Sequence, residues 1–389
     1  MQEAGEITIE LSHRGGSVDN VKLNSTRPVT AARVLIGKTP EQVLTMVPLL
    51  FSLCGNAQTD AALLACRAAL HLEADTTANA AREILVNVET LREHGWRILL
   101  DWPPLIGMQA DKTGVAALLK SCAGFAPLLF RNGAAFELDS VSNPKQEELE
   151  TLATGLRSLI DSFIFGDRLR QFRSINDEDG LLDWLDANDA LAARLLKAVY
   201  GSNGLDAGRN NVHCLPELDI QALFDMLQNH DLTEFSRAPH WQNTPYETTP
   251  LSRQQSQPLI KAMQSRYGNG LIVRFLATLS EVAALTEGLG EETLPCSKAF
   301  GLEEIGLAQV QAARGLLLHR VVLRHGRVYD YHIVAPTEWN FHPEGVAANG
   351  LRRLRANDGD GLRRQAHWLI QAIDPCVQFK LAMIAANSL

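Results

Sequence analysis

Several common signatures are missing from this sequence. None of its six cysteines forms a C-x-x-C pair, so the spacing of zinc sites is absent and a disulfide framework is not favoured. No H-E-x-x-H, G-x-S-x-G, Walker loop or strand-linked G-x-G-x-x-G is present. These absences leave zinc-protease, serine-hydrolase, nucleotide-binding and Rossmann functions without support.

Long apolar runs and excess positive charge are also missing. The most apolar stretch, 43–54, is shorter than the roughly 18 residues that span a bilayer, and the N-terminal residues lack the basic and apolar parts of a secretory signal. The formal net charge is −9, which disfavours nucleic acid as a partner. We therefore expect a cytoplasmic protein without membrane insertion and without bound nucleic acid.

The chain is rich enough in apolar residues to bury a large core. Of its 389 residues, 46% are hydrophobic, and no Pro, Ser or Gly linker divides the chain. We predict one predominantly helical α+β domain, 1–389. Alternation at 7–11 and 18–23 predicts an N-terminal sheet, and 316–323 with 328–334 predicts a C-terminal hairpin. The expected helices lie near 40–53, 58–72, 77–95, 111–122, 146–170, 181–200, 218–229, 254–267, 269–288, 345–355, 359–372 and 376–387.

Two of the six cysteines differ from the others by their local context. Cys54 lies where one predicted helix ends and another begins, and Cys376 follows Asp374-Pro375, which is typical of a helix start. A thiol at a helix N-terminus has a lowered pKa, and the thiolate is the metal-binding form. An isolated cysteine is more often a small buried apolar residue, and this alternative stays open for both.

Ordered motifs resemble those of nickel–iron hydrogenase large subunits. Val310–Gly315 is similar to E-A-P-R-G, Val334–Asn340 to V-x-P-T-T-W-N, and Asp374–Cys376 to the start of D-P-C-x-x-C-x-x-H. Gly37–Pro40 followed by Leu53–Gly55 is similar to G-R-x-P with R-x-C-G-x-C-x-x-x-H, and Glu247–Arg253 to G-P-L-A-R. The resemblance covers nearly the whole chain and implies the fold of that subunit.

The departures from the family pattern concern the metal ligands. In that family each C-x-x-C pair supplies a terminal nickel ligand and a bridging ligand. Here the first cysteines remain, as Cys54 and Cys376, whereas the bridging positions hold Ala57 and Phe379. The two histidine positions hold Ala61 and Ala382, and the R-x-E-G-H element is not visible. The resemblance therefore implies a non-catalytic relative, and nickel is not expected.

This pattern resembles the HupK/HoxV type of hydrogenase maturation protein. The resemblance implies that Cys54 and Cys376 transiently bind an iron fragment, Fe(CN)2(CO), and pass it to the hydrogenase large-subunit precursor. A HypC-like chaperone and other iron-fragment assembly proteins would be further partners. By motif match, the surrounding residues would be Arg314 and Thr337 beside the cyanides, with Pro336, Asp374 and Glu93 near them.

Three of these residues also have a plain structural explanation. Arg314 suits an ordinary ion pair, Thr337 a strand-end hydroxyl, and Asp374 a helix cap. Two other functions remain open for the chain. One is a metal-free pseudo-subunit that acts through its surface, and the other is a residual hydrogenase-like redox enzyme with a mononuclear site.

Overall fold

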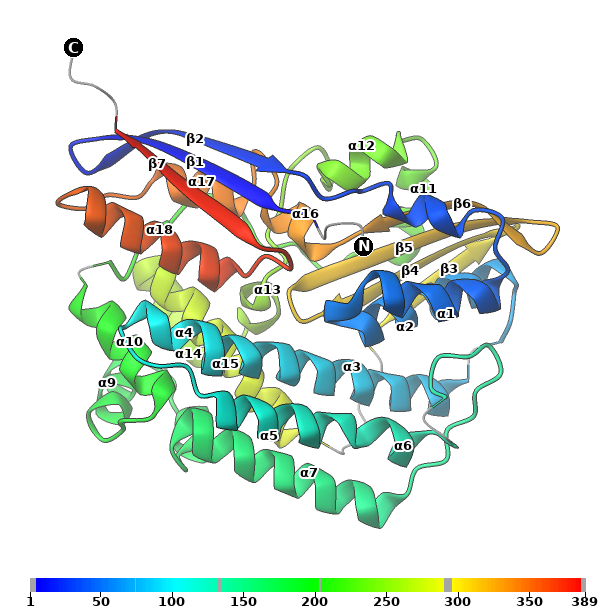
Figure 1. Cartoon of the computed structure of the whole chain (residues 1–389), viewed down its shortest axis with the longest axis horizontal. Coiled ribbons are helices and arrows are strands. Elements are labelled where there is room, and N and C mark those ends of the chain that lie inside the picture. The colour runs from blue at the N-terminus through cyan, green and yellow to red at the C-terminus, as the bar shows by residue number, and fades with distance from the viewer. Residues whose placement is uncertain (1–4, 74, 132–133, 203, 290–295, 386–389) are drawn as a thin grey trace.

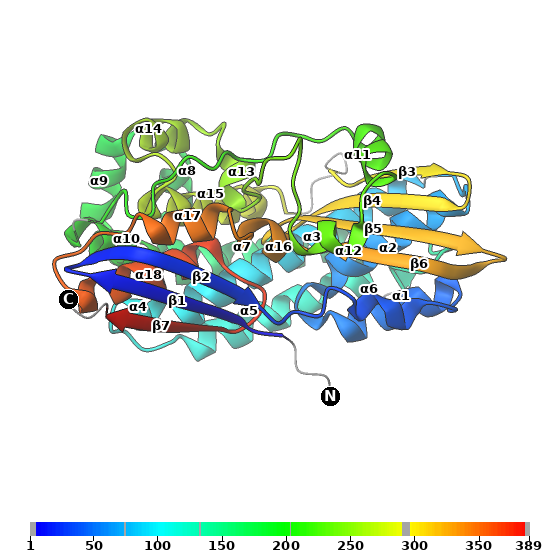
Figure 2. The same ribbon diagram turned by 90° about the horizontal axis from the view of Figure 1, so that it is seen from above.

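A computed structural model describes residues 5–73, 75–131, 134–202, 204–289 and 296–385. A long helical layer lies beside two separate sheets (Figures 1 and 2). The strands are β1 Ile7–Arg14, β2 Ser17–Ser25, β3 Lys298–Leu302, β4 Ile305–Ala312, β5 Gly315–Arg324, β6 Arg327–Val334 and β7 Phe379–Ala385.

Helices make up most of the remaining described chain. In the first half they are α1 Pro40–Leu50, α2 Gly55–Ala69, α3 Thr76–Trp96, α4 Trp102–Leu105, α5 Lys112–Ala123, α6 Phe125–Leu129, α7 Gln146–Ile160, α8 Leu169–Arg173, α9 Glu178–Asp186 and α10 Leu191–Gly201. In the second half they are α11 Ile220–Leu227, α12 Leu232–Arg237, α13 Pro250–Gln254, α14 Pro258–Tyr267, α15 Leu271–Glu287, α16 Pro336–Asn340, α17 Val346–Arg352 and α18 Gly359–Ile373. Short 3-10 turns cover Ala31–Leu35 and Ser52–Cys54, and π-helical turns cover Arg97–Asp101 and Asp161–Phe165.

The smaller sheet has the strand order β2-β1-β7. The central strand is β1, in which the alternate residues Ile7, Ile9 and Leu11 are fully buried. Alternate side chains of a strand point to the same face of the sheet, so one face of β1 is buried. The hairpin partner β2 is antiparallel to β1, whereas β7 from the opposite end of the chain is parallel to it. The N-terminal sheet is confirmed, but the helix expected at 376–387 is wrong as far as the structure describes it, because Phe379–Ala385 is a strand.

The larger sheet is an antiparallel meander, β3-β4-β5-β6. The predicted hairpin is confirmed as β5 and β6, with His325 and Gly326 at positive φ in its turn. β3 and β4 were not predicted as strands. One face packs on α1 and α2, and the other on α11 and α12.

Small residues let α2 approach this sheet closely. Its buried face carries Ala61, Ala62 and Ala65, and a Cβ built on Gly306 of β4 would lie 1.9 Å from the Ala65 carbonyl oxygen. Glycine at this place is therefore a packing requirement. The close contact lies in the C-terminal half of α2 and fixes the distance of this helix from the sheet.

Most helix predictions are confirmed, with shifted ends. The helix α1 starts at Pro40 as expected, with a capping box of Thr39 and Gln42, but it ends at Leu50 and not near 53. The helix expected at 181–200 is two helices, α9 and α10, and the one at 146–170 ends in a π-helical turn before α8. The core helices α3, α5, α7 and α15 pack together below the two sheets (Figure 1).

Candidate functional site

Cys54 lies at a sharp bend of the chain. α1 and the segment Ser52–Ala69 meet at 102°, and Cys54 is the residue before α2. Its Sγ receives a hydrogen bond from Nε2 of Gln58 at 3.6 Å. The predicted junction of two helices is confirmed at this position.

The predicted lowering of the thiol pKa is wrong for Cys54. Burial, together with the nearby carboxylate of Glu89, raises the pKa of Cys54 to about 12. The backbone N–H groups of Asn56 and Ala57 at the start of α2 both donate to Glu89, each at 2.9 Å. The carboxylate therefore takes the helix-terminal donors that were expected to stabilise a thiolate.

Cys376 lies in the loop between α18 and β7, so the predicted helix start is wrong. Asp374 ends α18 in the left-handed conformation, with φ 60°, instead of starting a new helix. Cys376 Sγ lies 2.9 Å from Nη1 of Arg27 and 3.0 Å from Oγ1 of Thr337. The sulfur is thus held by side-chain donors from the segment after β2 and from α16, and not by a helix end.

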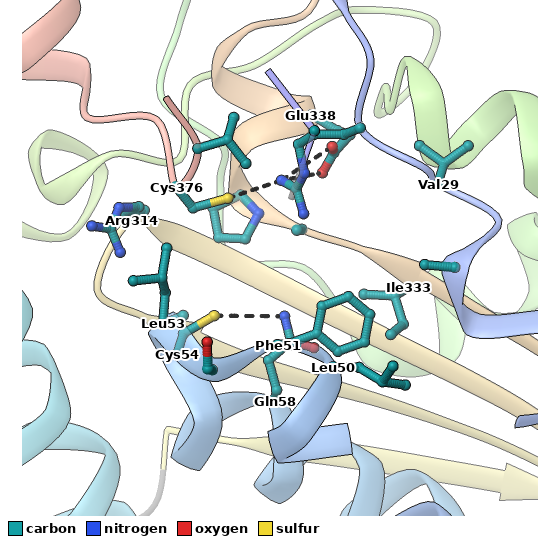
Figure 3. Close-up of a pocket in the computed structure, with 18 of the residues that line it drawn as sticks. Val29, Leu50, Phe51, Leu53, Cys54, Gln58, Arg314, Ile333, Glu338 and Cys376 are labelled. Carbon is teal, nitrogen blue, oxygen red and sulfur yellow. Dashed lines mark hydrogen bonds and ion pairs between the residues drawn. The ribbon is translucent and has the colours of Figure 1, made fainter. Parts of the chain in front are cut away.

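One cavity of about 380 Å³ contains both cysteines. Cys54 and Cys376 lie on opposite walls, and Arg314 lies at the side (Figure 3). The remaining polar lining includes Arg27 and Glu338, and most of the surface is apolar. The apolar lining comes from Pro28, Val29, Ala31, Ala32, Leu49, Leu50, Phe51, Leu53, Ala312, Ala313, Ile333, Ala335, Pro336 and Val377.

Arg314 is the centre of a buried ion-pair network beside this cavity. Its Nη1 lies 3.1 Å from Glu93, and its Nε lies 3.1 Å from Asp374. Asp374 also pairs with Arg97 at 2.7 Å. Burial alone would lower the pKa of Arg314, but Asp374 and Glu93 raise it, so the guanidinium stays charged.

The backbone around Arg314 is held by close contacts. Gly315 has φ +130°, and a Cβ there would lie 2.2 Å from the Thr248 carbonyl oxygen. Asn340 donates to the Arg314 carbonyl at 2.9 Å, and Arg253 donates to the Ala313 carbonyl at 2.9 Å. These contacts join the E-A-P-R-G-like and G-P-L-A-R-like segments. They fix the position of the backbone at Arg314, from which its side chain extends toward the cavity.

All of the predicted site residues lie in this one region. Cys54, Cys376, Arg314 and Pro336 line the cavity, Thr337 contacts Cys376, and Asp374 and Glu93 contact Arg314. Asp374 does cap a helix, but at the C-terminal end of α18 and not at an N-terminus.

Three cavity residues were missed from the sequence. Arg27 pairs with Glu338 at 3.2 Å and also contacts the Cys376 sulfur. Gln58 contacts the Cys54 sulfur. Arg27 and Gln58 belong to no quoted motif, whereas Glu338 lies inside the V-x-P-T-T-W-N-like segment, which was the one available signal.

The four positions that the motif resemblance matches to the other hydrogenase metal ligands carry no donor side chain. Ala57 and Ala61 are buried in α2, while Phe379 and Ala382 lie in β7. Across the described parts of the chain, no group of three or more His, Cys, Asp or Glu side chains is placed to hold a metal ion.

No family model matches the sequence. The hydrogenase expression/formation protein HupK of Rhodobacter capsulatus is 38% identical over 366 residues, which cover 94% of each chain. The chain belongs to the HupK/HoxV family of hydrogenase expression/formation proteins. HupV of Azotobacter chroococcum, at 28% identity over 98% of this chain, and HoxV of Cupriavidus necator, at 29% over 97%, are further relatives of this kind.

The fold of this HupK/HoxV family member is that of a nickel–iron hydrogenase large subunit. The reduced nickel–iron–selenium hydrogenase of Desulfomicrobium baculatum matches 94% of this chain with a TM-score of 0.66 at 14% identity. The corresponding enzyme of Desulfovibrio vulgaris Hildenborough matches with a TM-score of 0.64 at 16% identity. The resemblance predicted from the motifs is confirmed for both the fold and the family.

Among the described residues of this HupK/HoxV family member, no helix by itself combines the length and the apolar composition of a membrane span. α1 and the segment Ser52–Ala69 reach the required length and composition only as a bent pair.

Proposed function

We propose that this chain is a non-catalytic cytoplasmic scaffold that holds Fe(CN)2(CO) between Cys54 and Cys376 and passes it to the hydrogenase large-subunit precursor. The observation that carries the proposal is the single cavity that both cysteines line. They come from opposite ends of the sequence, and their side chains face the same space (Figure 3).

The donor set suits a metal that brings its own ligands. Two sulfurs are too few for a protein-only metal centre, but soft thiolates bind a soft iron fragment whose other positions are already filled. Cyanide nitrogens accept hydrogen bonds, and the guanidinium groups of Arg27 and Arg314 supply donors at the cavity. The apolar lining, including Pro336, suits the carbonyl ligand, and the volume is within the range of small-molecule sites.

The same features disfavour a nickel–iron pair. A bridging ligand must supply a sulfur that touches both metals, and Ala57 and Phe379 supply none. The scaffold would therefore hold the iron fragment without completing the catalytic centre. A HypC-like chaperone and other iron-fragment assembly proteins would deliver the fragment, and the large-subunit precursor would receive it.

Cysteine variants made in cells that contain the maturation machinery test the proposal. Anaerobically purified wild-type protein should carry stoichiometric iron, and Cys54→Ala and Cys376→Ala should carry none and should block hydrogenase maturation. Cys214→Ala is the matched control, because Cys214 is also a half-buried free cysteine but does not line the cavity. Normal maturation with both cavity variants would instead support a metal-free pseudo-subunit. Hydrogen turnover by the purified chain would support a residual enzyme.

A further inference from the structure

Three buried side chains form a continuous hydrogen-bonded series that ends on the Cys54 sulfur. Gln58 of α2 donates to Cys54 Sγ at 3.6 Å, and its Oε1 lies 2.8 Å from Nε2 of His319 on β5. Nδ1 of His319 lies 2.8 Å from the hydroxyl of Tyr331 on β6. Gln58, His319 and Tyr331 are each at most 2% exposed.

The protonation state of His319 determines which group donates and which accepts in each hydrogen bond of the series. Burial lowers the pKa of His319 to about 3, so the imidazole is neutral, with one donor and one acceptor nitrogen. Because Oε1 of Gln58 can only accept, Nε2 of His319 carries the hydrogen, and Nδ1 accepts from Tyr331. Gln58 is thereby oriented with its N–H group toward the sulfur (Figure 3).

These polar groups lie inside an otherwise apolar interface. The surroundings are the apolar cluster between α1, α2 and the larger sheet, which includes Ala62, Leu317 and Val321. Burying a glutamine and a histidine there is costly unless both are fully hydrogen-bonded. All of their ring and amide heteroatoms have partners, and the series ends at a cavity sulfur.

We propose that the series Tyr331–His319–Gln58 positions the Cys54 sulfur for iron and directs an amide N–H to it. Gln58 is a positioning residue, and His319 and Tyr331 act through it. The inference rests on the proposed function. A hydrogen bond to a metal-bound thiolate withdraws electron density from the metal, which weakens back-donation into the carbonyl ligand. Loss of that bond should therefore lower the carbonyl stretching frequency.

Infrared spectra of fragment-loaded protein test this inference. Gln58→Met keeps a similar volume but removes the N–H, so the carbonyl band should move to lower wavenumber and fragment affinity should fall about 10- to 100-fold. Tyr331→Phe removes only a hydroxyl at the far end and should move the band in the same direction by less. Gln309→Leu is the control, since Gln309 is a buried glutamine on β4 that donates to Leu218.

The possible outcomes distinguish a failure of this inference from a failure of the proposed scaffold function. If folded Gln58→Met and Tyr331→Phe give the same carbonyl frequency as the wild type, the positioning role is overturned. The proposed scaffold function is unaffected by that result. An equal shift in Gln309→Leu also overturns it, because the effect would then be general. Should Gln58→Met fail to fold, Tyr331→Phe alone decides. A wild-type protein without any bands contradicts the proposed function, and this inference with it.

Discussion

Oγ1 of Thr337 lies 3.0 Å from Sγ of Cys376 and also accepts the backbone N–H of Cys376 at 3.2 Å. Thr337 is buried in the first turn of α16, so one hydroxyl joins this helix to the chain that leads into β7. The hydroxyl fixes both the backbone and the sulfur of Cys376. It therefore links Cys376, one of the two proposed iron ligands, to the V-x-P-T-T-W-N-like segment.

Removing this hydroxyl should weaken both the fold and the site. Thr337→Val keeps the shape but leaves the N–H of Cys376 without its acceptor, which we expect to cost about 1–3 kcal/mol of unfolding free energy. Iron retained through gel filtration should fall as well. Thr337→Ser restores the hydroxyl and should restore both quantities. Equal behaviour of the serine and valine variants would contradict a role for the hydrogen bond.

The pair of Arg27 and Glu338 allows stability and fragment binding to be separated. Both side chains are largely buried, at 15% and 9% exposure, so Arg27→Met leaves an uncompensated carboxylate at a cost of about 3–5 kcal/mol. The double variant Arg27→Met/Glu338→Gln removes that charge and should recover most of the unfolding free energy. It should not recover iron retention, because the donor to Cys376 is still missing. Recovery of both would show that Arg27 only stabilises the fold.

The Cys54 thiol should resist alkylation in iron-free protein. Its pKa of about 12 leaves almost no thiolate at pH 7, so iodoacetamide should label the exposed Cys296 first, as read by peptide mass spectrometry. Labelling of Cys54 should accelerate as the pH rises. Glu89→Gln removes the neighbouring carboxylate and should also accelerate it. Rapid labelling of Cys54 at pH 7 would contradict its half-buried, uncharged state.

A buried acid should make the protein less stable as the pH rises from about 4 to 7. Burial and neighbouring Glu83 raise the pKa of Asp60 to about 7, although Arg82 opposes the shift. The folded state therefore holds the Asp60 proton more tightly than the unfolded state, and this contribution is lost as pH rises toward the folded pKa. We therefore expect the unfolding free energy, measured by urea titration at pH 5 and pH 8, to fall less with pH in Asp60→Asn than in the wild type. The expected difference is a few kcal/mol. Asp186→Asn, at an exposed position, should leave the slope unchanged.

The sequence was sufficient for the family, for the fold and for the expectation that Cys54 and Cys376 line one cavity, because these depend on local motifs kept in order. It was misleading at Asp374-Pro375-Cys376, whose residues are typical of a helix start. The structure instead ends α18 at Asp374 and pairs Phe379–Ala385 with β1, which is a contact between the two ends of the chain. No local pattern reports such a pairing, and the tertiary contact overrides the local preference.

The same reason explains the residues that were missed. Arg27 reaches Cys376 only because β1, β2 and β7 form one sheet, and Gln58 reaches His319 only because α2 packs closely on β5. The pKa of Cys54 could not be predicted either. Glu89 comes from α3 and takes the N–H groups of α2, which the sequence around Cys54 does not reveal.

Infrared spectroscopy tests the central claim most directly, because cyanide and carbonyl ligands absorb where proteins do not. Protein purified anaerobically from cells with the maturation machinery should show cyanide and carbonyl stretches. These bands should be absent from Cys54→Ala and from Cys376→Ala, and present in Cys214→Ala. A wild-type protein without such bands, or bands that persist in both cavity variants, would contradict the claim that the two cysteines hold the iron fragment.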